Sequence, residues 1–152
     1  MNKKIAVVII CLVCLRLAYG GDKLLTYETR YDNPIQAIRY SPDNKYLVIG
    51  TRNKVHIEDV AKGKGVKNLD VAGEVMDFSR DGKYLALGQN GGIQVFDVSS
   101  WECIQTIAPY TVMSFKFSPD GKYIANGANT TKIVEIWEVS SGKCIKTLEG
   151  HM

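Results

Sequence analysis

The sequence predicts an all-β fold that consists of three repeats, each containing four short antiparallel strands. A Ser-x-Asp-(Gly/Asn)-Lys-Tyr segment begins at intervals of 38 and 39 residues, at Ser41, Ser79 and Ser118. An apolar stretch that ends in an acidic residue follows each serine by 18, 18 and 20 residues, at Asp59, Asp97 and Glu138. Self-similarity at a period of about forty residues is typical of stacked repeats. We therefore expect each repeat to be one small sheet, buried on both faces.

Four strands are expected in each repeat, in the same order. The first precedes the serine, and its alternation places three pairs on one face, at Ile38 and Tyr40, Met76 and Phe78, and Phe115 and Phe117. The second is expected at Tyr46 to Ile49, Tyr84 to Leu87 and Tyr123 to Ala125, each stopped by a glycine, at Gly50, Gly88 and Gly127. The third is expected in the segment that ends in Asp59, Asp97 or Glu138. The fourth is expected at Val66 to Val71, Cys103 to Ile107 and Cys144 to Leu148.

The conformation of the turn after the first strand explains why these residue types occur in it. Proline presets φ at the second turn position, and aspartate bonds to its own backbone. Gly82 and Gly121 supply the left-handed conformation that ends the turn, and Asn44, which replaces glycine in the first repeat, also tolerates positive φ. Gln89 to Gly92 is expected to be a hairpin connection. A two-residue insertion in the third repeat is placed within Asn129 to Lys132.

The first twenty residues are predicted to be a cleavable secretory signal. Lys3 and Lys4 precede an apolar run from Ile5 to Leu15, and small residues stand three and one before a cut after Gly20. The run is shorter than the roughly twenty residues that a membrane-spanning helix needs. Residues 21–33 form a lead-in with a stray outer strand at Leu24 to Thr29, and the repeats cover 34–73, 74–111 and 112–152. We expect an exported protein, periplasmic or extracellular, that meets a membrane only through its signal.

The signal also accounts for the net charge of +3. Lys3, Lys4 and Arg16 are three of the nineteen Lys and Arg residues, and no acidic residue precedes Asp22. The mature chain is therefore nearly neutral and lacks the clustered cations that nucleic-acid binding normally shows. We expect no nucleic-acid partner.

Two cysteines, Cys103 and Cys144, remain after cleavage and occupy the same place in consecutive repeats. Equivalent atoms of neighbouring sheets are expected to lie well beyond the Cα separation of about 7 Å that a disulfide permits. The two thiols are predicted to be buried and to act as small apolar side chains.

The serine-proline-aspartate-glycine turns, the Ile136 to Val139 segment and the Gly150-His151 pair resemble the WD-repeat β-propeller family, from about Leu24 to the end. Trp137-Glu138 stands at the position of the dipeptide that names this family, and Phe96-Asp97 and Glu58-Asp59 stand at degenerate copies of it. The resemblance implies that each repeat is one propeller blade, about three in all, whereas closed rings have at least four. A fragment of a longer protein, an oligomer that closes the ring and a truncated product remain open, and the fragment is favoured.

The same family often ties each blade together with a hydrogen-bonded set of histidine, serine or threonine, aspartate and tryptophan. In this chain the aspartate position holds Arg52, Asn90 or Thr131, and the tryptophan occurs only as Trp137. We therefore expect this network to be absent and packing to hold the blades.

No residue pattern points to catalysis, a metal or a cofactor. His56 lies between Val55 and Ile57 and is interpreted as a strand residue rather than a general base. The repeated turn aspartates each stand alone, without the alternating acidic ligands of a calcium loop. The sequence thus predicts a protein that is not an enzyme and carries no cofactor.

The resemblance implies a scaffold that binds protein or peptide partners through loops between strands and between blades. The candidate contacts are Arg52, Lys54, Asn90, Trp101, Tyr110, Asn129 and Lys132. Trp101 has two interpretations, an exposed anchor for a partner or, with more weight, packing at the blade edge. Terminal blades with an uncovered face also predict self-association. The rival hypothesis is the propeller portion of a larger enzyme, a hydrolase or kinase, whose catalytic domain lies beyond Met152.

Overall fold

The computed structural model describes Tyr31 and residues 33–128 and 133–149. The chain divides into two units, Met1–Asp32 and Asn33–Met152, and the fold described below belongs to the second. The predicted signal, the predicted strand at Leu24 to Thr29 and the loop insertion at Asn129 to Lys132 lie outside the described residues. Within the described part of the chain, no helix has the length and apolar character needed to cross a membrane.

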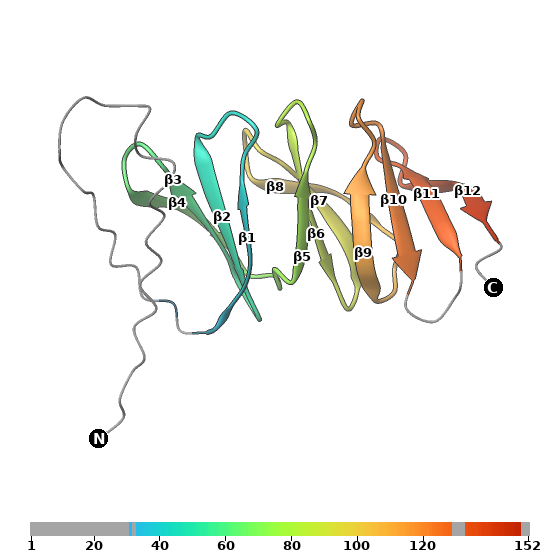
Figure 1. Ribbon diagram of the computed structural model, residues 1–152, viewed down its shortest axis with the longest axis horizontal. Helices are drawn as coiled ribbons and strands as arrows, with labels where there is room; N and C mark the ends of the chain where they lie inside the picture. Colours follow the sequence, from blue (N-terminus) through green and yellow to red (C-terminus); the bar gives the residue numbers. More distant parts are fainter. Residues whose placement is uncertain (1–30, 32, 129–132, 150–152) are drawn as a thin grey trace, which may run out of the picture. The chain divides into compact units, whose positions relative to one another are not determined.

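The repeats form three four-stranded antiparallel sheets, which we call blades 1 to 3 (Figure 1). Blade 1 contains β1 (Ile35–Tyr40), β2 (Tyr46–Thr51), β3 (Val55–Asp59) and β4 (Lys64–Leu69). Blade 2 contains β5 (Val75–Phe78), β6 (Tyr84–Gln89), β7 (Gly92–Asp97) and β8 (Glu102–Ile107). Blade 3 contains β9 (Val112–Phe117), β10 (Tyr123–Ala128), β11 (Val134–Glu138) and β12 (Lys143–Leu148). Strands pair in chain order within each blade, which confirms the predicted fold class.

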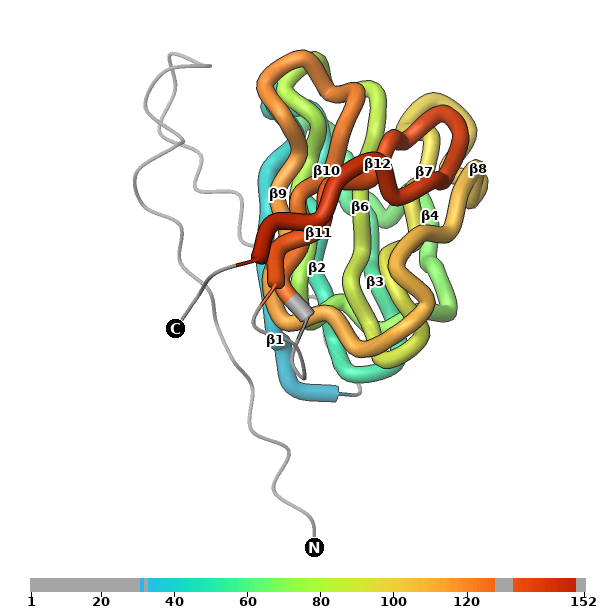
Figure 2. Tube along the Cα trace, turned by 90° about the vertical axis from the view of Figure 1, so that its right-hand side faces the viewer, coloured from blue at the N-terminus to red at the C-terminus, as the bar shows by residue number. Residues whose placement is uncertain are grey.

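Blade 2 packs between the other two, and its first strand, β5, contacts both β1 and β9 (Figure 1). In the view turned by 90°, the three blades lie one behind another (Figure 2). One apolar cluster joins blades 1 and 2 through Val48, Val55, Ile57, Leu69, Met76, Leu85, Leu87, Phe96 and Trp101. A second joins blades 2 and 3 through Ala86, Ile93, Val95, Ile107, Ala108, Val112, Phe115, Ile124 and Val139. Successive strand residues face opposite neighbours. Blade 2 is therefore buried on both faces, as predicted.

The serine turns are three copies of one hydrogen-bonded motif. In blade 2, Ser79 Oγ donates to Asp81 Oδ1 at 2.7 Å, and Tyr84 N donates to Ser79 Oγ at 2.9 Å. Lys83 N donates to the same Asp81 oxygen at 3.1 Å, and the other two turns repeat all three bonds. Asn44 has φ 60°, beside 73° for Gly82 and 71° for Gly121, so the predicted role of asparagine at this position is confirmed.

The prediction that glycines stop the second strands was wrong, because β2, β6 and β10 all continue past them. At Gly50 an added Cβ would lie 2.0 Å from the Gly73 carbonyl oxygen, and at Gly88 it would lie 2.8 Å from the Phe115 ring. These glycines therefore allow the next blade to approach closely, which a pattern of strand breakers does not reveal.

The prediction of buried thiols was also wrong, because Cys103 and Cys144 are free and exposed. They lie on β8 and β12, the outer strands of their blades, where one edge has no neighbouring strand within the blade. Residues 102–104 of β8 and all residues of β12 are exposed, so these outer strands leave the thiols uncovered whichever face they occupy.

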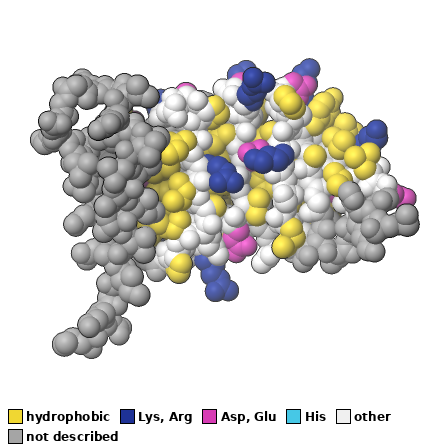
Figure 3. Space-filling view, in the orientation of Figure 1, with side chains coloured by type: hydrophobic (Ala, Val, Ile, Leu, Met, Phe, Trp, Pro, Cys, Tyr) yellow, Lys and Arg dark blue, Asp and Glu magenta, His cyan; other side chains and the backbone are white. Residues whose placement is uncertain are grey.

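The outward face of blade 3 is less covered than its equivalents in the described residues. Leu69 and Ile107 are covered by the next blade and are only 6% and 1% exposed. Leu148, at the same repeat position in blade 3, is 42% exposed. On the face drawn in Figure 3, Lys and Arg side chains are interspersed with Asp and Glu side chains rather than gathered in one patch.

Candidate functional site

The predicted contact loops lie at one end of the blades, opposite the serine turns and lowest in Figure 1. A four-stranded meander brings its second-to-third connection and its link to the next blade to the same end. This end carries Arg52–Lys54 between β2 and β3, and Asn90–Gly91 between β6 and β7. It also carries the blade connections 70–74 and 108–111. We call these residues the loop surface.

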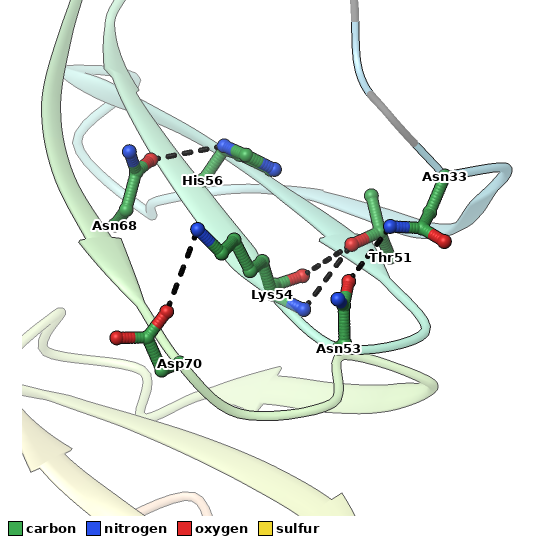
Figure 4. Close-up of polar contacts among 7 residues, drawn as sticks. All are labelled: Asn33, Thr51, Asn53, Lys54, His56, Asn68 and Asp70. Atoms are coloured by element: carbon green, nitrogen blue, oxygen red, sulfur yellow. Dashed lines mark hydrogen bonds and ion pairs between the residues drawn. The ribbon is translucent and has the colours of Figure 1, made fainter.

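In blade 1 a buried threonine fixes the loop that carries Arg52 (Figure 4). Thr51 Oγ1 donates to the Lys54 carbonyl at 2.9 Å, and Lys54 N donates to Thr51 Oγ1 at 3.2 Å. Thr51 N donates to the same carbonyl at 2.8 Å, which closes the turn. The side chains of Arg52 and Lys54 remain exposed. The loop thus presents two cations from a backbone with little freedom.

Polar contacts extend from this loop to its neighbours (Figure 4). Asn33 Nδ2 donates to Asn53 Oδ1 at 2.9 Å, and Lys54 Nζ lies 3.6 Å from Asp70 Oδ1. His56 Nδ1 lies 2.9 Å from Asn68 Oδ1, so this histidine is a hydrogen-bonded strand residue as predicted. The exposed Lys54–Asp70 pair contributes at most about 1 kcal/mol to stability.

In blade 2 the loop surface is held by close backbone packing. Gly92 has φ 120°, and a Cβ there would lie 2.6 Å from the carbonyl oxygens of both Ile107 and Ala108. The β6–β7 hairpin, which was predicted, thus rests on the link to blade 3, and Asn90 at its tip is exposed. Tyr110 on the same link is half-buried against the second apolar cluster.

The structure brings Arg52, Lys54, Asn90 and Tyr110 to one end of the molecule, whereas Asn129 and Lys132 lie outside the described residues. Trp101 does not belong with them. It follows β7 at the opposite end, is 6% exposed, and packs edge-on against Tyr46, with ring centroids 5.2 Å apart. Packing between blades, rather than an exposed anchor, is therefore correct for this residue.

Trp101 also occupies an unusual backbone position. Its φ is 57°, and the equivalent residues are Gly63 and Gly142, with φ 59° and 67°. A bulky side chain with positive φ is strained and persists only where its surroundings favour it. A tryptophan where two sister repeats have glycine is the sequence signal that could have identified this contact as structural.

The opposite end carries two equivalent open clefts between neighbouring blades, of about 450 and 460 Å³. Both are lined by the aspartates and lysines of the serine turns. Hydrogen bonds from Ser41, Ser79 and Ser118 lower the pKa of Asp43, Asp81 and Asp120 respectively. These carboxylates are engaged in their own turns, so the clefts are less suited than the loop surface to holding a partner.

Among the described residues, no three or more His, Cys, Asp or Glu side chains are placed to hold a metal ion. The exposed side chains of the loop surface include the cations Arg52 and Lys54, the amides Asn53 and Asn90, and the carboxylates Asp70 and Glu74, whereas the Tyr110 hydroxyl is buried.

The sequence model of the family described as Eukaryotic translation initiation factor eIF2A matches residues 14–152, most of the chain. The chain belongs to the eIF2A family. The matched residues include all three blades of the structure, together with residues that precede the first one. Membership in this family agrees with the WD-repeat resemblance of the blades.

Solved structures show the same fold as this eIF2A-family chain. One, titled "Structure of U3-55K", is 19% identical over 82% of this chain with a TM-score of 0.73. Another, titled "Crystal structure of RRP9 WD40 repeats", gives the same identity, coverage and TM-score. The chain spans only 42% and 41% of their lengths. At this identity the likeness concerns the fold, which is that of WD40 propeller blades.

Sequence reasoning missed the residues that support the loop surface, namely Asn33, Thr51, Asn53 and Asp70. Thr51 directly follows the glycine that was taken as the end of a strand, so it was assigned to a loop rather than to a buried strand end. Asp70 lies in the link to blade 2, and its pairing with Lys54 depends on register across β3 and β4, which sequence spacing alone does not provide.

Proposed function

We propose that this chain is an exported, non-enzymatic scaffold that binds a protein or peptide partner through the loop surface. The observation that carries the proposal is the exposure of Arg52, Lys54 and Asn90 on loops whose backbones are fixed by hydrogen bonds and close packing. Fixed loops lose little conformational entropy on binding, which favours affinity. Arginine is enriched at protein interfaces, and its guanidinium recognises carboxylates in bidentate geometry.

The test is cross-linked capture of partners from extracts of the compartment where the protein resides, with three forms of the full chain. We expect the Arg52→Ala, Lys54→Ala, Asn90→Ala triple variant to lose most of the capture seen with the unmodified chain. The matched control is the Lys83→Ala, Lys122→Ala double variant, which alters exposed lysines at the opposite end. Equal capture by all forms, or selective loss in the control, would contradict the proposed binding end.

Export is supported by the basic residues, apolar run and small residues of the first twenty positions. N-terminal sequencing of the protein recovered from the periplasm or medium should begin at Gly21. Recovery of the full chain inside the cell would remove export from the proposal and leave the binding role untouched.

The eIF2A family description names a translation initiation factor. A role in translation would require the chain to remain inside the cell with ribosomes. Separating the cell contents from the periplasm and medium therefore also distinguishes a role in translation from an exported role. Co-sedimentation of the unprocessed chain with ribosomal subunits would place the scaffold in translation rather than outside the cell.

Self-association is a second candidate, supported by the outward face of blade 3. Val134 and Ile136 are half-buried and Leu148 is exposed, whereas their equivalents in blades 1 and 2 are buried against the next blade. The partner in this candidate is blade 1 of a second copy. Light scattering should then show a dimer of the full chain that becomes monomeric in the Leu148→Asp variant. A monomer at every concentration tested would reject the candidate.

A further inference from the structure

The interface between blades 2 and 3 contains buried polar atoms that the proposed binding function does not use. Asn126 is 1% exposed, and both its Oδ1 and its Nδ2 lack a hydrogen-bond partner in the protein. Glu135 Oε2 and Trp137 Nε1 are likewise buried without a partner. Buried polar groups are nearly always hydrogen-bonded, so four such atoms on neighbouring side chains require an explanation.

These three side chains lie on one face of blade 3. Asn126 and Glu135 are directly paired across β10 and β11, and Trp137 is paired with Ile124. Ile124 is fully buried in the cluster shared with blade 2, and Trp137 packs against that cluster. Because side chains two residues apart on a strand share a face, Asn126 also points toward blade 2. Directly opposed residues such as Asn126 and Glu135 have Cβ atoms about 5 Å apart, and diagonal neighbours such as Asn126 and Trp137 lie about 7–8 Å apart, which is within reach of a long aromatic side chain.

The chemistry of the four atoms identifies what would satisfy them. Asn126 Oδ1 and Glu135 Oε2 accept hydrogen bonds, whereas Asn126 Nδ2 and Trp137 Nε1 donate them. A water molecule offers two donors and two acceptors, which matches this set. Interior waters are typically found where two to four otherwise unsatisfied polar groups converge. We propose that the interface between blades 2 and 3 binds an internal water molecule through Asn126, Glu135 and Trp137.

The equivalent place between blades 1 and 2 provides an internal comparison. There the three repeat positions hold Leu87, Gln94 and Phe96, and only Gln94 Oε1 is buried without a partner. Leu87 and Phe96 belong to the apolar cluster of that interface. A leucine is therefore compatible with the backbone at the position of Asn126, which makes Asn126→Leu an informative substitution.

The direction of the change in thermal stability separates a hydrated site from a dry one. If the water is bound, Asn126→Leu removes two of its hydrogen bonds, and we expect Tm of the full chain to fall by about 3 °C or more. If the interface is dry, the same substitution replaces an unsatisfied amide with an apolar side chain, and Tm should rise. A rise in Tm overturns the proposal. The Asn126→Leu, Glu135→Gln, Trp137→Phe variant copies blade 2 and should recover most of the loss.

A direct observation keeps the proposal testable if the variants fold poorly. A crystal structure of the unmodified full chain at high resolution should show a water peak within hydrogen-bond distance of Asn126, Glu135 and Trp137. In solution, the indole N–H of Trp137 should give a cross-relaxation signal with a long-lived water. Direct hydrogen bonds among the three side chains, with no solvent between them, would overturn the proposal.

Discussion

Leu87, Gln94 and Phe96 face blade 1 from blade 2, whereas Asn126, Glu135 and Trp137 face blade 2 from blade 3. The two interfaces thus share one backbone arrangement but differ in chemistry. The first is closed by aliphatic and aromatic packing, including the edge-on contact between Trp101 and Tyr46. The second has buried polar side chains and an ion pair, in which Lys116 Nζ lies 2.7 Å from Asp77 Oδ1. The repeat determines which strand positions meet between blades, and the individual side chains at those positions determine how stable each interface is.

Removal of Trp101 should have the largest effect on the first interface. Truncation of a buried large aromatic residue costs about 3–5 kcal/mol of unfolding free energy. We expect Trp101→Ala to fall within this range in chemical denaturation of the full chain. Trp101→Gly should cost no more than alanine despite its smaller side chain, because glycine adopts the φ of 57° without strain. A much larger loss for glycine than for alanine would show that backbone strain at this position is negligible.

Substitutions of the strand glycines compare packed interfaces with the open face of blade 3. Gly50→Ala and Gly88→Ala should each lower the free energy of unfolding by about 1–3 kcal/mol, since the added Cβ meets the Gly73 carbonyl or the Phe115 ring. Gly127→Ala is the matched control, because no heavy atom lies within 4 Å of its added Cβ. Its unfolding free energy should change little. An equal loss at Gly127 would indicate that this face is covered in solution.

The strands and turns could be predicted from the sequence because their determinants are local. The serine and aspartate of each turn bond within six residues, and Asn44 replaces glycine without changing the turn. The exposure of Cys103 and the burial of Trp101 could not be predicted, because the uncovered outer strand decides the first and packing between blades decides the second. The glycines at 50 and 88 were misread for the same reason, since their closest neighbours are 23 and 27 residues away.

For the candidate site, sequence reasoning located loops but not their supports. It placed Arg52, Lys54 and Asn90 correctly at loop positions that the structure shows to be exposed. The sequence did not reveal that Thr51 fixes one of these loops through hydrogen bonds, or that Gly92 packs on residues 107 and 108 and so fixes the other. Exposure can be inferred from polarity and turn residues, whereas rigidity depends on contacts between segments that are distant in sequence.

The ion pair offers a smaller test of the second interface. Asp77 is mostly buried at 15% exposure, and its Oδ2 also accepts a hydrogen bond from Phe117 N at 3.1 Å, whereas Lys116 is 69% exposed. Asp77→Ala should therefore cost about 1–3 kcal/mol, because it leaves a backbone donor of blade 3 unpaired. Lys116→Ala should lower the free energy of unfolding by less than about 1 kcal/mol, and this effect should disappear at high salt. Equal losses would place the stabilisation in the ion pair rather than in the backbone contact.

The smallest expected effect is the pH dependence of the serine turns, which all three blades share. The hydrogen bond from Ser79 holds the pKa of Asp81 below its usual value of 3.8, so the folded state binds the proton less readily than the unfolded state. The resulting stability is fully present above that value and is lost as the pH falls through the lower folded-state pKa. The difference in unfolding free energy between the unmodified chain and the Ser79→Ala variant should therefore stay constant from neutral pH to about pH 5. It should shrink below about pH 4. A difference that widens on acidification would contradict this assignment. Ser114→Ala, at an exposed serine outside the turns, is the matched control and should show no such trend.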